Sequence, residues 1–236
     1  MKRSFAILLA ALALAACNEK PEEPAVPQQV RITPVITRAT DVNFEDGDAI
    51  GLTITRAAGA YATNEKLTYS GTSFSGSLNW YSEGNETSSL KAYYPYSATV
   101  PATFTVQTDQ SQGITSSDFM SATKSDVYPT ANDVAMVFTH KLTKILVKIT
   151  NESGGTIEGV KMGGVIPTAV IDPDTYGATV STSAEATTIK AYKVDQNTYA
   201  LIVPAQTATM TVTVTASGKE LSQKLTATEM GSGFQY

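Results

Sequence analysis

Residues 209–225 read T-M-T-V-T-V-T-A-S-G-K-E-L-S-Q-K-L, and this stretch decides the fold class. Its first part alternates threonine with an apolar residue, which is the two-residue period of a half-buried β-strand. Ser217 and Gly218 then supply a turn, and a second segment returns from it. The apolar positions of the two segments are Met210, Val212, Val214, Leu221 and Leu225. The stretch therefore predicts a β-hairpin.

The same alternation recurs through the chain after residue 29, and no long stretch shows helical spacing. The alternating segments cover residues 30–36, 50–54, 104–106, 134–138, 145–149 and 199–203. Pro34 lies in the first of them and cannot donate to a strand ladder, so we expect that strand at a sheet edge. We predict an all-β chain of two tandem β-sandwich domains of about 100 residues each. Their expected bounds are 30–132 and 133–236.

The first residues have the pattern of a lipoprotein signal peptide. Lys2 and Arg3 precede an uncharged apolar run that ends in L-A-A-C at residues 14–17. The run is too short for a membrane-spanning helix, which needs about 20 residues. Cys17 is the only cysteine and stands where a lipoprotein receives its lipid. We predict a signal peptide at 1–16, palmitate-type lipidation of Cys17, and a disordered tether over 17–29.

Composition argues against several classes of function. The formal net charge of −5 leaves no basic surface for nucleic acid. His140 is the only histidine, and neither a zinc ligand set nor a nucleophile-elbow motif accompanies it. The acidic residues 41–48 depart from the EF-hand register and instead indicate a turn, in which Gly47 supplies the unusual backbone angle. We predict no catalytic residues, no metal, no cofactor and no enzymatic activity.

An aromatic cluster leaves two interpretations open. Tyr93, Tyr94 and Tyr96 follow one another closely, and Trp80 is the only tryptophan. Tyrosines that alternate on a strand commonly cover the edge of a core. The same residues can instead form a platform on which a glycan ring stacks. The second interpretation describes a surface lipoprotein that binds glycan without polymerising.

Five segments in series resemble the fimbrillin family of Gram-negative anaerobes. They are N-F-E-D-G-D-A-I-G-L (43–52), L-K-A-Y-Y-P-Y (90–96), F-T-V-Q-T-D-Q-S (104–111), S-D-F-M-S-A (117–122) and V-F-T-H-K-L-T-K-I (137–145). The resemblance implies two tandem transthyretin-like (Greek-key) β-sandwich domains in a type V pilus subunit. It also implies export as a lipoprotein to the outer membrane, strand complementation with other fimbrial subunits, and adhesion to a host or bacterial surface ligand.

The resemblance further implies proteolytic maturation after an arginine. Cutting between Arg38 and Ala39 releases the lipid together with the first strand, and we prefer this site to the alternative between Arg56 and Ala57. A donor strand can repair a groove left by one strand. Arg38 as a plain solvated turn residue remains the competing interpretation. Family members usually continue beyond an F-x-Y segment such as residues 234–236, so we expect the C-terminal domain to be truncated or completed by a partner.

Overall fold

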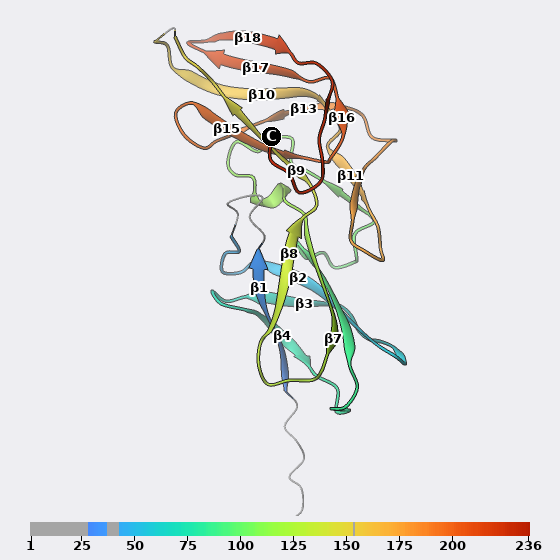
Figure 1. The fold of residues 1–236 in the computed structure, drawn as a ribbon. Coiled ribbons are helices and arrows are strands. Elements are labelled where there is room, and N and C mark those ends of the chain that lie inside the picture. The colour runs from blue at the N-terminus through green and yellow to red at the C-terminus, as the bar shows by residue number, and fades with distance from the viewer. Residues whose placement is uncertain (1–27, 37–42, 153) are drawn as a thin grey trace, which may run out of the picture.

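The computed structural model describes residues 28–36, 43–152 and 154–236. The described residues are all-β, apart from one short 3-10 turn, η1 (Thr115–Ser117). Seven of the described strands close into a barrel in the order β1-β4-β3-β2-β5-β7-β8. Their bounds are β1 (Gln29–Ile36), β2 (Ala49–Arg56), β3 (Gly59–Tyr69), β4 (Phe74–Asn79), β5 (Ser88–Tyr94), β7 (Met120–Val127) and β8 (Val134–His140). The barrel forms the lower half of the molecule in Figure 1.

The upper half in Figure 1 contains smaller sheets that share a second core. The sheet orders are β13-β10-β17-β18, β14-β15-β9, β12-β11-β6 and β16-β19. The four-stranded sheet comprises β10 (Ile157–Val165), β13 (Thr187–Lys190), β17 (Thr211–Ala216) and β18 (Lys219–Lys224). The others comprise β6 (Thr103–Thr105), β9 (Thr143–Lys148), β11 (Thr168–Ile171), β12 (Ala178–Val180), β14 (Tyr192–Lys193), β15 (Thr198–Val203), β16 (Thr207–Ala208) and β19 (Thr228–Glu229).

The predicted hairpin of residues 209–225 is confirmed. β17 and β18 pair antiparallel from Thr211–Lys224 to Ala216–Lys219. Ser217 and Gly218 both adopt positive φ angles, 48° and 72°, as a tight hairpin turn with the right twist requires. The turn predicted before β2 is also present, with Gly47 at a φ of 96°.

The predicted boundary between residues 132 and 133 is not where the sheets divide. β8 belongs to the barrel, and the chain enters the second half only at β9. The inward residues of β8 fill the first core together with β1, so the turn signals before Val134 mark a loop within the barrel. Conversely, β6 leaves the barrel between β5 and β7 and pairs with β11. The two halves are therefore connected more than once along the sequence.

The C-terminal residues add to the second half beside β9. The amide of Lys144 donates to the carbonyl of Phe234 (3.0 Å), and the amide of Leu146 donates to that of Tyr236 (2.7 Å). The amide of Tyr236 donates back to the carbonyl of Lys144 at 3.0 Å. This segment is thus a short parallel neighbour of β9, and the C-terminus lies close to β9 in Figure 1.

Candidate functional site

β1 closes the barrel by pairing with a strand on each side. It runs antiparallel to β4 from Gln29 to Ile32 and parallel to β8 from Ile32 to Ile36. The prediction that this strand lies at a sheet edge is therefore wrong. Pro34 is tolerated because the pairing with β4 has ended at Ile32, two residues earlier. β1 and β8 lie side by side at the centre of Figure 1.

The inward face of β1 covers the core of the barrel. Val30 and Ile32 are fully buried, and Ile36 packs against the same cluster. Phe44 lies in this core, with its ring centroid 4.8 Å from that of Phe74 and 5.4 Å from that of Phe138. Burial of an aliphatic side chain contributes roughly 1.5–3 kcal/mol. β1 is thus held chiefly by its apolar face.

β4 and β8 differ in how much of their strand pairing is made with β1. β4 also pairs with β3 at two positions, Ser75 and Phe74. β8 pairs with β7 only at Thr139 and His140. Among the described residues, the ladder of Val134–Phe138 is therefore made with β1 alone. Removal of β1 exposes the apolar core and leaves most of β8 without a paired neighbour.

The outward face of β1 contributes less to its retention. Arg31 Nε lies 3.1 Å from a carboxylate oxygen of Asp133, and the Thr33 hydroxyl donates to the same carboxylate at 3.2 Å. The Arg31 side chain is 45% exposed. Ion pairs at this exposure are screened by water and salt and stabilise little. This contact aligns β1 with the loop before β8 without fixing it strongly.

The predicted modification and cleavage residues divide into two groups. Cys17, Arg38 and Ala39 lie outside the described residues. Arg56 is among the described residues. It lies at the end of β2, and its side chain already has binding partners. Its Nε donates to a Glu86 carboxylate oxygen at 2.9 Å, and its guanidinium also contacts Glu83 at 3.3 Å.

The contacts around Arg56 all favour its positive charge. The hydrogen bond with the Glu86 carboxylate raises the pKa of Arg56 and lowers the pKa of Glu86. The guanidinium carbon also lies 4.4 Å above the ring of Tyr81. A protease that recognises arginine must extract this side chain from its partners before the bond to Ala57 can be cut.

The four aromatic residues of the predicted glycan platform do not share an exposed surface. Trp80 and Tyr94 are buried in the first core, whereas Tyr93 is buried in the second. The Tyr93 ring lies over Gly51, which has no side chain, and its hydroxyl donates to Asn64 at 2.8 Å. Only Tyr96 is partly exposed. The predicted platform is not formed, because strand alternation directs neighbouring tyrosines into opposite cores.

Burial is also the main cause of the raised pKa of Tyr94. Its hydroxyl donates to Asp48 at 3.0 Å. Burial, followed by the nearby Asp48 carboxylate, raises the pKa of Tyr94 far above its ordinary value. Tyr94 is thus a core residue that anchors the turn before β2.

The lone histidine occupies the junction of the two halves. His140 ends β8, and its Nδ1 lies 2.7 Å from a carboxylate oxygen of Asp118, with both side chains buried. In the described part of the chain, no group of three or more His, Cys, Asp or Glu side chains could hold a metal ion. The same residues contain no helix long and apolar enough to cross a membrane.

The alternation over residues 30–36 predicts the strand β1 but not its partner. Val134, Met136 and Phe138 of β8 complete the same core, whereas the sequence predicts them in the second domain. The two strands lie about a hundred residues apart and pair in parallel, so no turn links them. The matching alternation of the two segments was the one available signal.

Comparisons with known proteins agree with this fold. A candidate cell adhesion protein from Bacteroides ovatus matches with a TM-score of 0.73 and 19% identity, over 89% of this chain and 90% of that one. Another from Bacteroides uniformis matches with a TM-score of 0.65 and 23% identity, over 84% and 88%. A fimbrial protein from Bacteroides ovatus matches with a TM-score of 0.56 and 18% identity, over 89% and 47%.

Among curated proteins, none matches this chain. The family model described as fimbrillin-like matches residues 37–236, which is most of the chain. That match confirms the resemblance carried by the five sequence segments. The chain belongs to the fimbrillin-like family.

Proposed function

We propose that this chain is a structural subunit of a cell-surface fimbria of the type V kind, without catalytic activity, which serves adhesion. It is exported as a lipoprotein through Cys17 and reaches the outer membrane on that lipid. Other fimbrial subunits are its partners. Membership of the fimbrillin-like family supports the proposal, as does likeness to a fimbrial structure and to candidate adhesion structures.

The single observation that carries the assembly mechanism is the position of β1. This strand fills a gap between β4 and β8, covers an apolar core and precedes the predicted cleavage site at Arg38. Release of β1 leaves unpaired backbone groups next to exposed apolar side chains. A strand from another subunit repairs both defects when it enters the same gap.

The gap specifies what a donor strand must look like. The donor has to run parallel to β8 and antiparallel to β4, as β1 does. It must also present apolar side chains at alternate positions to replace Val30 and Ile32. Specificity in such strand addition comes from these alternate positions, whereas the backbone ladder supplies affinity.

The contacts of Arg56 support cleavage at Arg38 as the preferred route. Arg56 is held by two carboxylates and a tyrosine ring, so its bond to Ala57 is a poor protease substrate in the folded protein. A cut there also removes β2, which pairs with both β3 and β5. Loss of β2 opens the barrel at a second place that a single donor strand cannot repair.

The finer architecture belongs to the same proposal. We interpret the two halves as a tandem pair of transthyretin-like, Greek-key β-sandwich domains, the first closed by β1. In this interpretation the lipid on Cys17 delivers the subunit, and the cut after Arg38 decides whether the anchor is kept.

Digestion of the purified full-length precursor with an arginine-specific protease tests the mechanism. We expect one early product whose N-terminus is Ala39 by mass spectrometry, followed by oligomers on size-exclusion chromatography. Arg38→Gln should abolish both, whereas the matched Arg56→Gln variant should give the same product and the same oligomers.

Two results would overturn the proposal. One is a first cut after Arg56 that leaves the Arg38 bond intact. The other is a stable product starting at Ala39 that stays monomeric, which is the behaviour of a non-polymerising surface lipoprotein.

A further inference from the structure

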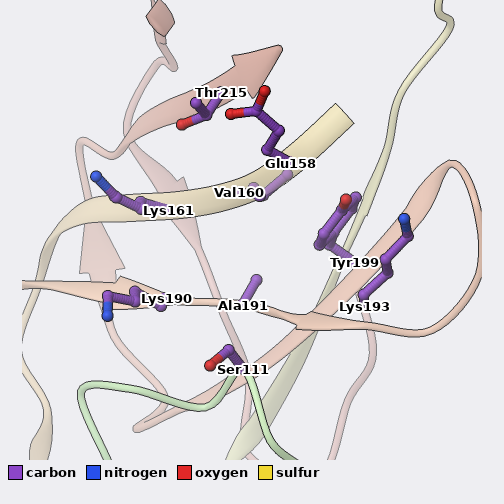
Figure 2. Close-up of a pocket in the computed structure, with 10 residues that line it drawn as sticks. Ser111, Glu158, Val160, Lys161, Lys190, Ala191, Lys193, Tyr199 and Thr215 are labelled. Atoms are coloured by element: carbon purple, nitrogen blue, oxygen red, sulfur yellow. The ribbon is translucent and has the colours of Figure 1, made fainter. Parts of the chain in front are cut away.

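A break in one sheet of the second half creates a pocket. β10 pairs with β13 only from Lys161 onward, because the chain leaves this sheet after Lys190 and joins β15 as β14. The amide of Ala191 donates to the carbonyl of Val160 at 2.9 Å and ends the contact. The earlier part of β10 and β14 therefore diverge, and a pocket of about 340 Å³ lies between them. Figure 2 shows it.

The floor of the pocket is small and apolar. Val160 and Ala191 lie at its centre, and Tyr199 closes one side (Figure 2). All three side chains belong to the second core and are at most 5% exposed. Gly159 also lines the pocket, and a Cβ atom built there would meet no atom within 4 Å. A glycine inside a strand, next to an irregularity in the pairing with β17, often marks a place where a ligand approaches the backbone. Open space beside Gly159 fits that interpretation.

The rim is polar and carries three ammonium groups, which is unusual in a chain of net charge −5. Lys161 and Lys190 lie at one end of the pocket and Lys193 at the other (Figure 2). Lys161 pairs with Glu220 at 3.0 Å and Lys190 with Asp109 at 2.6 Å. All four of these side chains are at least 41% exposed, so the pairs are weak and can exchange partners.

Lys193 differs from the other two lysines. Within the described part of the chain, its ammonium has no hydrogen-bond or ion-pair partner. The hydroxyls of Ser111 and Thr215 and the carboxylate of Glu158 complete the polar lining. One oxygen of Glu158 accepts from the amide of Gly218 at 2.9 Å, and the Ser111 hydroxyl donates to Asp109 at 2.6 Å, so both groups are left as acceptors for a ligand. The pocket thus combines a cation, hydroxyl groups and an acceptor around an apolar floor.

We propose that this pocket binds a carboxylated saccharide of one or two rings. The carboxylate lies at Lys193, the ring hydroxyls bond to the side-chain oxygens of Ser111, Thr215 and Glu158, and the C–H face of the ring packs on the open floor beside Gly159. The volume is within the range of small-molecule sites, which begins at about 300 Å³. This inference goes beyond the assembly role, since the unassembled precursor already carries the pocket, which is also distinct from the predicted aromatic platform.

The test is a pair of ligands that differ at one group. Glucuronate and glucose are titrated into the full-length Arg38→Gln precursor and followed by calorimetry or saturation-transfer NMR. A hydrogen bond to a charged group predicts binding of glucuronate about tenfold tighter than glucose or more. Higher salt should weaken the binding of glucuronate and leave the binding of glucose unchanged, because exposed charges are screened.

Two variants locate the binding. Lys193→Gln should weaken glucuronate about tenfold, while Lys224→Gln, an exposed lysine on β18, should not. Gly159→Leu should fill the pocket and abolish binding. Gly84→Leu is its matched control, since Gly84 also has open space around its Cβ position and no positive φ. The circular dichroism spectrum and Tm of each variant report whether it is folded.

Three outcomes would overturn the inference. They are equal affinity for glucuronate and glucose, unchanged binding in folded Lys193→Gln, and binding of an acidic peptide of Asp and Glu in place of the saccharide. Failure of the Arg38 mechanism does not affect this test, because the ligands are titrated into an uncut monomer.

Discussion

β1 and β18 are both strands that the sequence predicts, but they differ in how their neighbours hold them. β1 has a paired neighbour on both sides, and its inward residues Val30 and Ile32 are fully buried. β18 pairs with β17 alone, and every one of its residues is exposed, including Leu221 at 68%. Both segments form strands, but only β1 has paired neighbours on both sides.

Charge distinguishes the two strands. β18 carries Lys219, Glu220 and Lys224 within six residues, whereas β1 carries only Arg31. Charged side chains on an edge strand discourage pairing with other chains. β18 is thus protected as a permanent edge, and β1 has the composition of a strand meant to be covered.

The largest expected difference is between one buried and one exposed aliphatic side chain. Ile32→Ala should lower the free energy of unfolding by about 2–5 kcal/mol, because it leaves a cavity against Phe74 and β8. Leu221→Ala should change it by no more than about 0.5 kcal/mol. Urea unfolding of the uncut protein measures both, and equal losses would remove the distinction between closure and edge.

A smaller effect is expected at the turn that makes β18 possible. Gly218 has a φ of 72°, and a residue with a Cβ in this conformation costs about 1–2 kcal/mol. Gly218→Ala should lower the free energy of unfolding by that amount, whereas Gly84→Ala, where φ is ordinary, should not. If the two substitutions change the free energy of unfolding equally, the positive φ at Gly218 is not what stabilises the hairpin.

The smallest effect concerns pH and the ion pairs of the two halves. The hydrogen bond from Arg56 lowers the pKa of Glu86 in the folded state below its ordinary 4.5. Its stabilisation is complete above that ordinary value and is lost as the pH falls through the lowered one. Wild type should therefore exceed Glu86→Gln in stability at pH 7, and the difference should shrink below about pH 4.5.

The matched control is Glu220→Gln on β18, whose partner Lys161 is 41% exposed. An exposed pair of this kind stabilises little, so this substitution should leave the unfolding midpoint at pH 7 nearly unchanged. Denaturant titrations at several pH values compare the two variants. A Glu86→Gln deficit that persists undiminished at pH 3 would mean that ionisation is not its cause.

Local patterns in the sequence predicted the strands well. The alternation over residues 30–36 predicted the strand β1, and Ser217–Gly218 predicted the turn between β17 and β18. Each of these rests on neighbouring residues, whose geometry is fixed by backbone preference and side-chain period. The class of the fold followed from the same signals.

Pairing between distant strands could not be predicted from local sequence patterns. The parallel contact of β1 with β8, which puts β8 in the barrel, was not predicted, because nothing local links residue 32 to residue 134. Tyr93 and Tyr94 were assigned to one surface although they face different cores. The pocket beside Gly159 depends on where β13 stops, which is set by packing in three dimensions.

Replacement of β1 by a free strand tests the central proposal most directly. After cleavage at Arg38, the fragment that begins at Ala39 is separated in denaturant and refolded with a labelled peptide of residues 28–36. We predict that it binds this peptide, that the peptide with Ile32→Asp binds at least about tenfold more weakly, and that bound peptide blocks oligomer formation. A fragment that stays folded and monomeric without affinity for either peptide would contradict the proposal.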